Sequence, residues 1–133
     1  MLIDCDSVIL IHFLDANDAS HVRAAQRLAA LQSAGDEIAV SDLTRLECRV
    51  KPIQLADSQR LAIFDGFFAL SDVRRVPLTT AVFDRATGLR AQFAFKTADA
   101  LQLAAAIEAG CGLFLTADTK LARCTAIHVE VLS

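Results

Sequence analysis

The sequence predicts an α/β fold in which a mainly parallel central sheet of about four to five strands has helices on both faces. Short apolar segments typical of buried strands alternate along the chain with longer segments of helical periodicity, and few hairpin signals separate them. Such alternation is typical of parallel sheets, because their crossover helices cover both faces. Right-handed crossovers then bring the carboxyl ends of the strands to one edge of the sheet.

Length and composition favour a single domain over residues 1–133. The chain is 54% hydrophobic, which is too apolar for a disordered protein, yet no apolar run approaches the roughly 20 residues that span a bilayer. Its opening lacks the basic flank of a signal peptide, so we expect a cytoplasmic protein with no membrane partner. A net charge of −3 argues against holding nucleic acid through a general basic surface.

The opening segment is a short apolar run interrupted by Asp4 and Asp6, which predicts a strand, a polar loop and then a helix over 7–14. A second helix is expected over 20–33, with Ser20 as its N-cap. The apolar positions of this second helix share one broad face. They are Val22, Ala25, Leu28, Ala29 and Leu31.

A second strand is expected over 37–40, and Ser41 is suited to cap the helix that follows. Three apolar residues of this helix are expected to face inward. They are Leu43, Leu46 and Val50. Glu47 lies one turn after Leu43 and therefore at the border of the buried face. We expect Pro52 to end the helix, because the residue before a proline is disfavoured in the α region.

Asp57 or Ser58 is expected to start a helix that is rich in phenylalanine and leucine. Its apolar residues are Leu61, Phe64, Phe67, Phe68 and Leu70. This aromatic concentration exceeds what one narrow core-facing stripe needs, so two interpretations stay open: core, or partly a protein interface.

The second half of the chain repeats the alternation of strand and helix. The expected strands are 73–78, 111–116 and 127–132, and the expected helices are 80–93, 98–109 and the short 119–123. Thr79 or Thr80 is suited to cap the first of these helices, and Thr97 the second. Asp99 falls in the first turn of the helix over 98–109, where the helix dipole favours a carboxylate ion.

Four acids occupy places from which they can meet at the carboxyl edge of the sheet. Asp4 and Asp118 each follow a strand, Asp99 begins a helix, and Glu47 lies within one. Ligands of open α/β sheets bind just beyond the carboxyl ends of the strands. We therefore expect these four carboxylates to form a candidate site.

Carboxylate oxygens without partnering histidine or cysteine suit Mg²⁺ or Mn²⁺ better than zinc. The three histidines lack ligand-like spacing, and the four cysteines lack CxxC spacing and are expected to be free, mostly buried thiols. Packed carboxylates raise one another's pKa unless a divalent cation binds. A cation so held can generate hydroxide and stabilise charge on a phosphate. The acids therefore predict phosphodiester hydrolysis by a metal-activated water.

Four segments together resemble the PIN domain, and within that group the VapC toxins of bacterial toxin–antitoxin pairs. They are 3–8 (IDCDSV), 41–47 (SDLTRLE), 97–106 (TADALQLAAA) and 115–118 (LTAD). Each motif is weak alone, but the order and spacing of all four are specific, and the match covers nearly the whole chain.

The resemblance implies a PIN fold and a Mg²⁺- or Mn²⁺-dependent endoribonuclease. It further implies a homodimer that is inhibited by a cognate antitoxin. Carried over to this sequence, it implies that Asp4, Asp99 and Asp118 bind metal directly or through water and that Glu47 completes the cluster. Thr116 would hold a carboxylate or water in place. The role of Asp6, as ligand or support, stays open.

Arg45 and Arg49 flank Glu47 and are candidate contacts for substrate phosphates or for an acid of the antitoxin. An ordinary solvated helix face is the alternative for both.

Two further functions are alternatives. The segment from Asp4 to Asp6 also fits the Asp-x-Asp motif of haloacid-dehalogenase-like phosphatases, in which the first Asp is a nucleophile and the second a general acid. That family needs a paired acidic motif after its Thr or Ser strand, and no acidic pair follows Thr116. The other alternative is a non-catalytic protein-binding module that uses Phe64 to Phe68 as its surface.

Overall fold

The computed structural model describes residues 1–132. Its strands are β1 (Leu2–Cys5), β2 (Glu37–Ser41), β3 (Val73–Val76), β4 (Leu113–Thr116) and β5 (Val129–Val131). Its α-helices are α1 (Ser7–Leu14), α2 (His21–Ser33), α3 (Asp42–Gln54), α4 (Ser58–Phe68), α5 (Thr80–Phe93) and α6 (Thr97–Glu108). A 3₁₀ helix, η1 (Thr119–Arg123), lies between β4 and β5.

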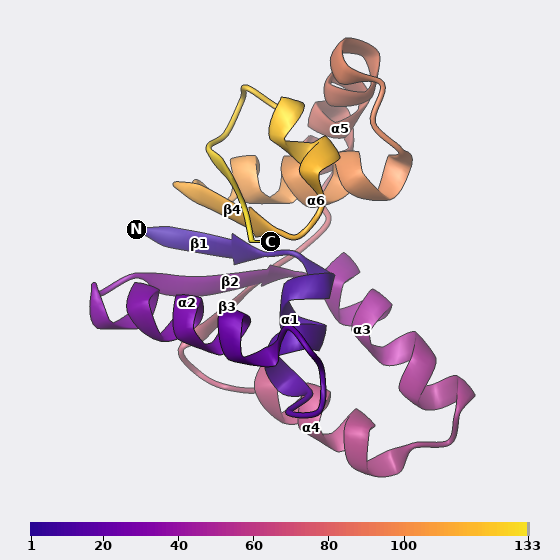
Figure 1. The fold of residues 1–133 in the computed structure, drawn as a ribbon. Coiled ribbons are helices and arrows are strands. Elements are labelled where there is room, and N and C mark those ends of the chain that lie inside the picture. Colours follow the sequence, from indigo (N-terminus) through magenta and orange to yellow (C-terminus); the bar gives the residue numbers. More distant parts are fainter. Residues whose placement is uncertain (133) are drawn as a thin grey trace.

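The five strands form one parallel sheet in the order β3-β2-β1-β4-β5. The predicted α/β architecture is therefore confirmed, and Figure 1 shows its layers with the sheet seen nearly edge-on. Helices α5 and α6 cover one face, and α1 to α4 lie on the other side. Because all strands run the same way, their carboxyl ends share one edge, where α1, α3 and the start of α6 lie.

Two apolar layers stabilise this arrangement, one on each face of the sheet. Alternate residues of β1 point to opposite faces, so Ile3 and Cys5 pack in the layer between the sheet and helices α1 to α4. Asp4 faces the opposite layer, in which α6 contributes tightly packed alanines. In the register of the sheet, Asp4 lies between Ala39 of β2 and Phe114 of β4. A carboxylate thus stands among apolar side chains, one residue before the carboxyl end of β1.

Helix α3 differs from its prediction in both its inner face and its end. Leu46 is 57% exposed and Val50 is 43% exposed, whereas Thr44, Cys48 and Pro52 are buried. The inner face is rotated because Thr44 has polar partners inside the fold, so burial does not follow hydrophobicity here. Helix α3 also continues through Pro52 to Gln54. The backbone N–H of Leu55 bonds to the Lys51 carbonyl, so the last turn closes without a donor from the proline.

Smaller corrections concern α2, α4 and α6. Val22 of α2 is 63% exposed, although it was expected on the inner face. Phe64 and Phe68 are buried, and Phe67 packs edge-on against Phe13 and Phe68, so this aromatic group belongs mainly to the core. Thr97 is the first residue of α6, and the residue before it occupies the cap position without a side-chain bond. The predicted caps Ser41, Asp57 and Thr79 are confirmed.

No helix within residues 1–132 has the length and apolar character needed to cross a membrane.

Candidate functional site

The candidate site lies at the carboxyl edge of the sheet, where β1 and β4 run side by side. Asp6 follows β1 directly, and its backbone N–H bonds to the Leu115 carbonyl of β4 at 2.9 Å. This bond holds the loop after β1 against the end of the neighbouring strand. Asp118 lies two residues after the end of β4. Parallel pairing of two adjacent strands thus places both acidic loops at one edge.

Asp4 is completely buried, and neither of its carboxylate oxygens has a hydrogen-bond partner. Burial raises the pKa of Asp4 well above its usual value, and the negative charge of Asp6 raises it further. An ionised carboxylate in such a place is costly unless a cation or a donor compensates it. Natural proteins leave few buried polar groups unpaired. The environment of Asp4 therefore suits a positively charged ligand.

Thr116 joins two acidic loops through its hydroxyl group. Its Oγ1 donates a hydrogen bond to Asp6 Oδ2 at 2.7 Å and accepts one from the Asp118 N–H at 3.1 Å. Asp6 Oδ1 also accepts a hydrogen bond from the N–H of Ser7, and Asp6 is thereby the N-cap of α1. Burial raises the pKa of Asp6, although the bonds from Thr116 and Ser7 act in the opposite direction. Asp6 is thus held in one orientation by the protein itself.

Glu47 is positioned by a buried network that starts at the N-terminus of α3. Ser41 Oγ and Thr44 Oγ1 donate to Gln102 Oε1 at 2.7 and 3.0 Å. The amide nitrogen of Gln102 must then point the other way, and it donates to Glu47 Oε1 at 2.7 Å. Ser41, Thr44 and Gln102 are all buried, so exchange of these bonds for water is unfavourable.

Electrostatic coupling links the acids into one group. The charge of Asp6 acts on Asp4, and the charges of Glu47 and Asp99 act on Asp6, in each case raising the pKa. Asp118 in turn raises the pKa of Asp99, whose burial raises it more strongly. The five carboxylates are therefore linked in a chain of like charges, from Asp4 through Asp6 to Glu47 and Asp99, and from Asp99 to Asp118.

The donor set fits a hard divalent cation. Within residues 1–132, no three carboxylate, histidine or cysteine side chains converge closely enough to form a complete metal-binding group as they stand. However, the unpartnered oxygens of Asp4, with the charge of Asp6 acting on them, are the kind of donor that Mg²⁺ or Mn²⁺ prefers, because both bind oxygen ligands and keep several waters. Asp4, Asp99 and Asp118 are the residues that would hold it.

The cysteines are unsuited to chemistry at this site. All four are free and buried. Burial raises the pKa of Cys48 to about 12 and that of Cys111 to about 12. Thiols with such values are protonated at neutral pH and react slowly. The prediction of buried free thiols is confirmed.

Arg45 and Arg49 lie away from this network. Both line a hollow on the outer side of α3, together with the apolar residues Leu46, Val50 and Ile53. The guanidinium group of Arg49 is bonded to Asp65 of α4 at 2.8 Å. Arg45 forms no ion pair with the carboxylates of residues 1–132 and remains available on the surface.

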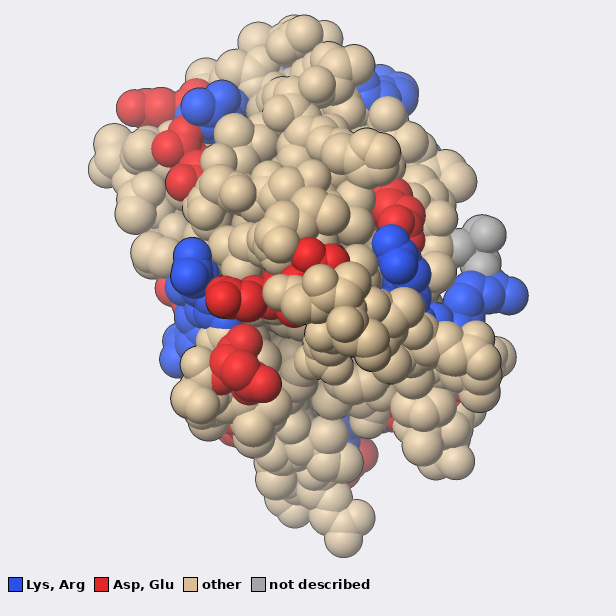
Figure 2. Space-filling view, turned by 90° about the vertical axis from the view of Figure 1, so that its left-hand side faces the viewer, with Lys and Arg blue, Asp and Glu red and all other residues tan. Residues whose placement is uncertain are grey.

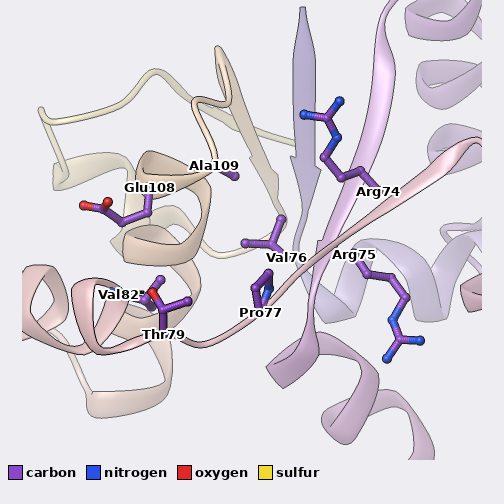
Figure 3. Close-up of a pocket in the computed structure, with 8 residues that line it drawn as sticks. All are labelled: Arg74, Arg75, Val76, Pro77, Thr79, Val82, Glu108 and Ala109. Atoms are coloured by element: carbon purple, nitrogen blue, oxygen red, sulfur yellow. Dashed lines mark hydrogen bonds between the residues drawn. The ribbon is translucent and has the colours of Figure 1, made fainter.

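A separate hollow between β3, α5 and the end of α6 lacks convergent chemistry (Figure 3). Arg74 and Arg75 point in different directions because adjacent strand residues project to opposite sides, and Glu108 points away from both. Each is already paired: Arg74 with Glu37, Arg75 with Asp42 and Glu108 with Arg85. This hollow therefore offers no focused binding site.

The face at the amino ends of the strands is similarly unspecialised. Figure 2 shows it as mostly uncharged surface, with acidic and basic groups scattered beside one another. Scattered charges of both signs give no directed attraction for a polyanion. The chemistry of the molecule is therefore concentrated at the opposite edge of the sheet.

Comparison with known families agrees with this geometry. The family model of the PIN domain matches residues 4–126, which span Asp4 and all the other acids of the site. The chain belongs to the PIN domain family. This membership sets aside the haloacid-dehalogenase-like alternative, because that alternative requires a different family. No match is found among curated proteins.

Several solved structures share the fold. VapBC2 from Rickettsia felis, bound to a DNA fragment from its promoter, matches with a TM-score of 0.81 and 17% identity over 100% of both chains. A toxin–antitoxin complex from Klebsiella pneumoniae matches with a TM-score of 0.74 and 23% identity over 98% of each chain. VapC20 from Mycobacterium tuberculosis, described as a Sarcin-Ricin loop cleaving toxin, has a TM-score of 0.69 and 16% identity, covering 84% of this chain and 86% of its own.

Sequence analysis missed Gln102 as a member of this PIN-domain site. A signal was present, since Gln102 is a lone amide in an alanine-rich helix and lies one turn after Asp99. A polar side chain at an otherwise buried position needs a partner. The identity of that partner, Glu47, depends on how α3 packs against α6 and is not encoded locally.

Proposed function

We propose that this PIN-domain protein is the toxin of a type II toxin–antitoxin pair and acts as a Mg²⁺- or Mn²⁺-dependent endoribonuclease. Its family membership and its likeness in fold to VapC structures support this function. The observation that carries the proposal is Asp4, whose buried and unpartnered carboxylate stands at the acidic edge of the sheet. A purely structural residue at this position would be apolar.

In the proposed mechanism, Asp4, Asp99 and Asp118 hold the cation directly or through water. When bound, the cation supplies an activated water and stabilises the charge that develops on the phosphate. Asp6 is held by Thr116 and adds negative charge behind these ligands. Thr116 also fixes the backbone at Asp118, so one hydroxyl group positions both loops.

Glu47 has a distinct role as the residue that orients the attacking water. Its Oε1 is occupied by Gln102, which leaves Oε2 to accept a hydrogen bond from water. Because the amide of Gln102 is fixed by two hydroxyl groups, this carboxylate is presented in one orientation. Fixed acceptors of this kind reduce the reorganisation needed during the reaction.

The decisive experiment is cleavage of mixed cellular RNA by purified protein free of any partner. Reactions with Mg²⁺, with Mn²⁺ and with EDTA are run beside the Asp99→Asn variant. Asp84→Asn is the matched control, because it makes the same chemical change at an exposed position of α5. Discrete products that require the metal and Asp99, but not Asp84, are expected. Failure of the folded, metal-loaded protein to cut any RNA would contradict the proposal.

The partners proposed are a cognate antitoxin and a second copy of the chain. The exposed apolar residues of α3, flanked by Arg45 and Arg49, suit an antitoxin segment that is apolar with acidic flanks. Leu46→Ser with Val50→Ser should weaken capture of the antitoxin, whereas the same changes should leave the protein folded. Light scattering of the purified chain tests the homodimer.

A further inference from the structure

Beside the acids lies a second feature, a hollow that also contains cations. Its principal lining residues are Phe95, Lys96, Asp99, Asp118, Lys120 and Arg123. Asp99 and Asp118 belong to the proposed metal-binding group, so the hollow is continuous with the site. The three cations come from two segments that are distant in sequence, the entrance to α6 and the 3₁₀ helix η1.

The cations of this hollow differ from most of the arginines in their pairing. Within residues 1–132, six arginines form ion pairs with carboxylates. Lys96, Lys120 and Arg123 form none there, although two carboxylates line the same hollow. Lys96 and Lys120 are close enough that their charges act on Asp99. Their donors are therefore near the acids and yet free for another anion.

Arg123 is held in place without loss of its anion-binding groups. Its guanidinium group lies over the ring of Phe95, 4.9 Å from the centroid, and its Nε donates to the Lys120 carbonyl at 3.2 Å. Phe95 is buried, and its own carbonyl accepts a bond from Arg90. The ring is thus a fixed support. The two terminal nitrogens of Arg123 remain available for a bidentate contact.

We propose that Lys96, Lys120 and Arg123 form a phosphate-binding subsite that holds the RNA backbone next to the cleaved bond. This inference rests on the proposed function, because it assigns a part of the same substrate. A polyanion that approaches five carboxylates is repelled, and cations at the rim offset that repulsion. Contacts to phosphate position a strand without reading its bases. The subsite therefore contributes affinity and register, while base selection comes from other residues.

The test compares two double variants that remove the same charges. Lys120→Gln with Arg123→Gln alters the subsite, and Lys51→Gln with Arg23→Gln removes one lysine and one arginine from exposed positions of α3 and α2. Binding of a fluorescent single-stranded RNA of mixed sequence is measured by anisotropy in EDTA, where no metal-dependent cleavage occurs. Salt is varied from about 50 to 200 mM, because counterion release dominates phosphate contacts. Single-turnover cleavage with Mg²⁺ follows.

We expect the subsite variant to bind RNA about tenfold more weakly than the control variant, with a salt slope reduced by about 1.4 for two lost phosphate contacts. In cleavage, half-saturation should require about tenfold more protein, while the maximal rate changes little. Lys96→Gln alone should show a smaller effect in the same direction. Equal affinity and equal slope for the two double variants would overturn the subsite.

The outcomes separate this inference from the proposed function. RNA binding that depends on the cations, without any metal-dependent cleavage by the parent protein, supports the subsite and contradicts the nuclease. Metal-dependent cleavage with unchanged binding by the subsite variant supports the nuclease and overturns the subsite. Absence of both RNA binding and metal-dependent cleavage by the parent protein overturns both.

Discussion

Asp4 and Glu47 belong to one acidic site but differ in the hydrogen bonds that the protein supplies to them. Glu47 receives a hydrogen bond from Gln102, which is itself fixed by Ser41 and Thr44. Asp4 receives none, although it is more deeply buried. The protein thus supplies a hydrogen bond to one oxygen of Glu47 and supplies none to either oxygen of Asp4.

This difference indicates two roles for the same functional group. A carboxylate that is already held by neutral donors is positioned to orient something else, whereas a buried carboxylate without donors has its charge satisfied only by a ligand. Binding of a cation would therefore offset the free-energy cost of burying the charge of Asp4.

The largest effect is expected from removing the charge at the proposed metal ligands. Asp4→Asn, Asp99→Asn and Asp118→Asn should each lower RNA cleavage at least about a hundredfold, because an amide is a weaker ligand for a hard cation. The measurement is single-turnover cleavage at saturating Mg²⁺. Circular dichroism of each variant should match the parent protein. A variant that cleaves at the parental rate removes that residue from the mechanism.

A smaller loss is expected where the protein only positions a carboxylate. Gln102→Leu should slow the maximal cleavage rate about 10- to 100-fold, because Glu47 loses the hydrogen bond from Gln102 and two hydroxyl groups lose their acceptor. Half-saturation by RNA should change little. Gln59→Leu, at an exposed position of α4, is the control for the substitution itself. Equal loss of rate and of RNA binding would argue against a positioning role.

Metal binding should stabilise the parent protein more than the Asp4 variant. A cation at about 100 times its dissociation constant contributes about 2.7 kcal/mol to the free energy of unfolding. We expect Mg²⁺ or Mn²⁺ to raise the melting temperature of the parent protein by several degrees, and to have little effect on Asp4→Asn. Gln102→Leu should keep the shift, because it leaves the proposed ligands intact. An equal shift in all three proteins would contradict ligation by Asp4.

The buried charge of Asp4 should also affect how the free energy of unfolding depends on pH when no metal is added. The pKa of Asp4 is raised by burial in the folded protein, so the folded state binds more protons than the unfolded state above the usual carboxyl value of about 3.9. Stability of the metal-free protein should therefore fall as the pH rises through that value towards the folded pKa. Asp4→Asn should flatten this fall and raise the melting temperature at pH 7, a sign opposite to its effect on activity.

The smallest effect on catalysis is expected on the outer side of α3. Arg45→Gln should leave RNA cleavage within about twofold and the free energy of unfolding within about 0.5 kcal/mol, because its side chain lies on the exposed hollow of α3 and not in the Glu47 network. The rate is measured as for the metal ligands. A loss as large as that of Gln102→Leu would place this surface within the substrate path.

Much of the fold was predictable because its signals are local. Alternating periodicities, the caps Ser41, Asp57 and Thr79, and the apolar strands each depend on a few neighbouring residues. The acidic residues at strand ends were also visible, because parallel strands that alternate with helices bring those ends to one edge. Their roles as metal ligands remain predictions, whereas the structure shows the charges of neighbouring acids acting on Asp4, Asp6 and Asp99.

Other features depended on packing between distant segments. Leu46 and Val50 are exposed although they are apolar, because α3 turns Thr44 towards Gln102 and satisfies the polar network instead. Helix α3 also continues past Pro52, and backbone bonds from Leu55 to Lys51 and from Asp57 to Pro52 close its end.

By itself, the sequence determined the α/β class, the order of the elements and which acids stand at strand ends, since these follow from periodicity and from the direction of parallel strands. Only the tertiary structure decided which acid has no hydrogen-bond partner and which accepts a hydrogen bond from the protein. Hydrogen bonds and desolvation depend on neighbours contributed by distant segments, as Gln102 of α6 does for Glu47 of α3. For the same reason, the cations at the start of α6 and in η1 line one hollow only in the folded chain.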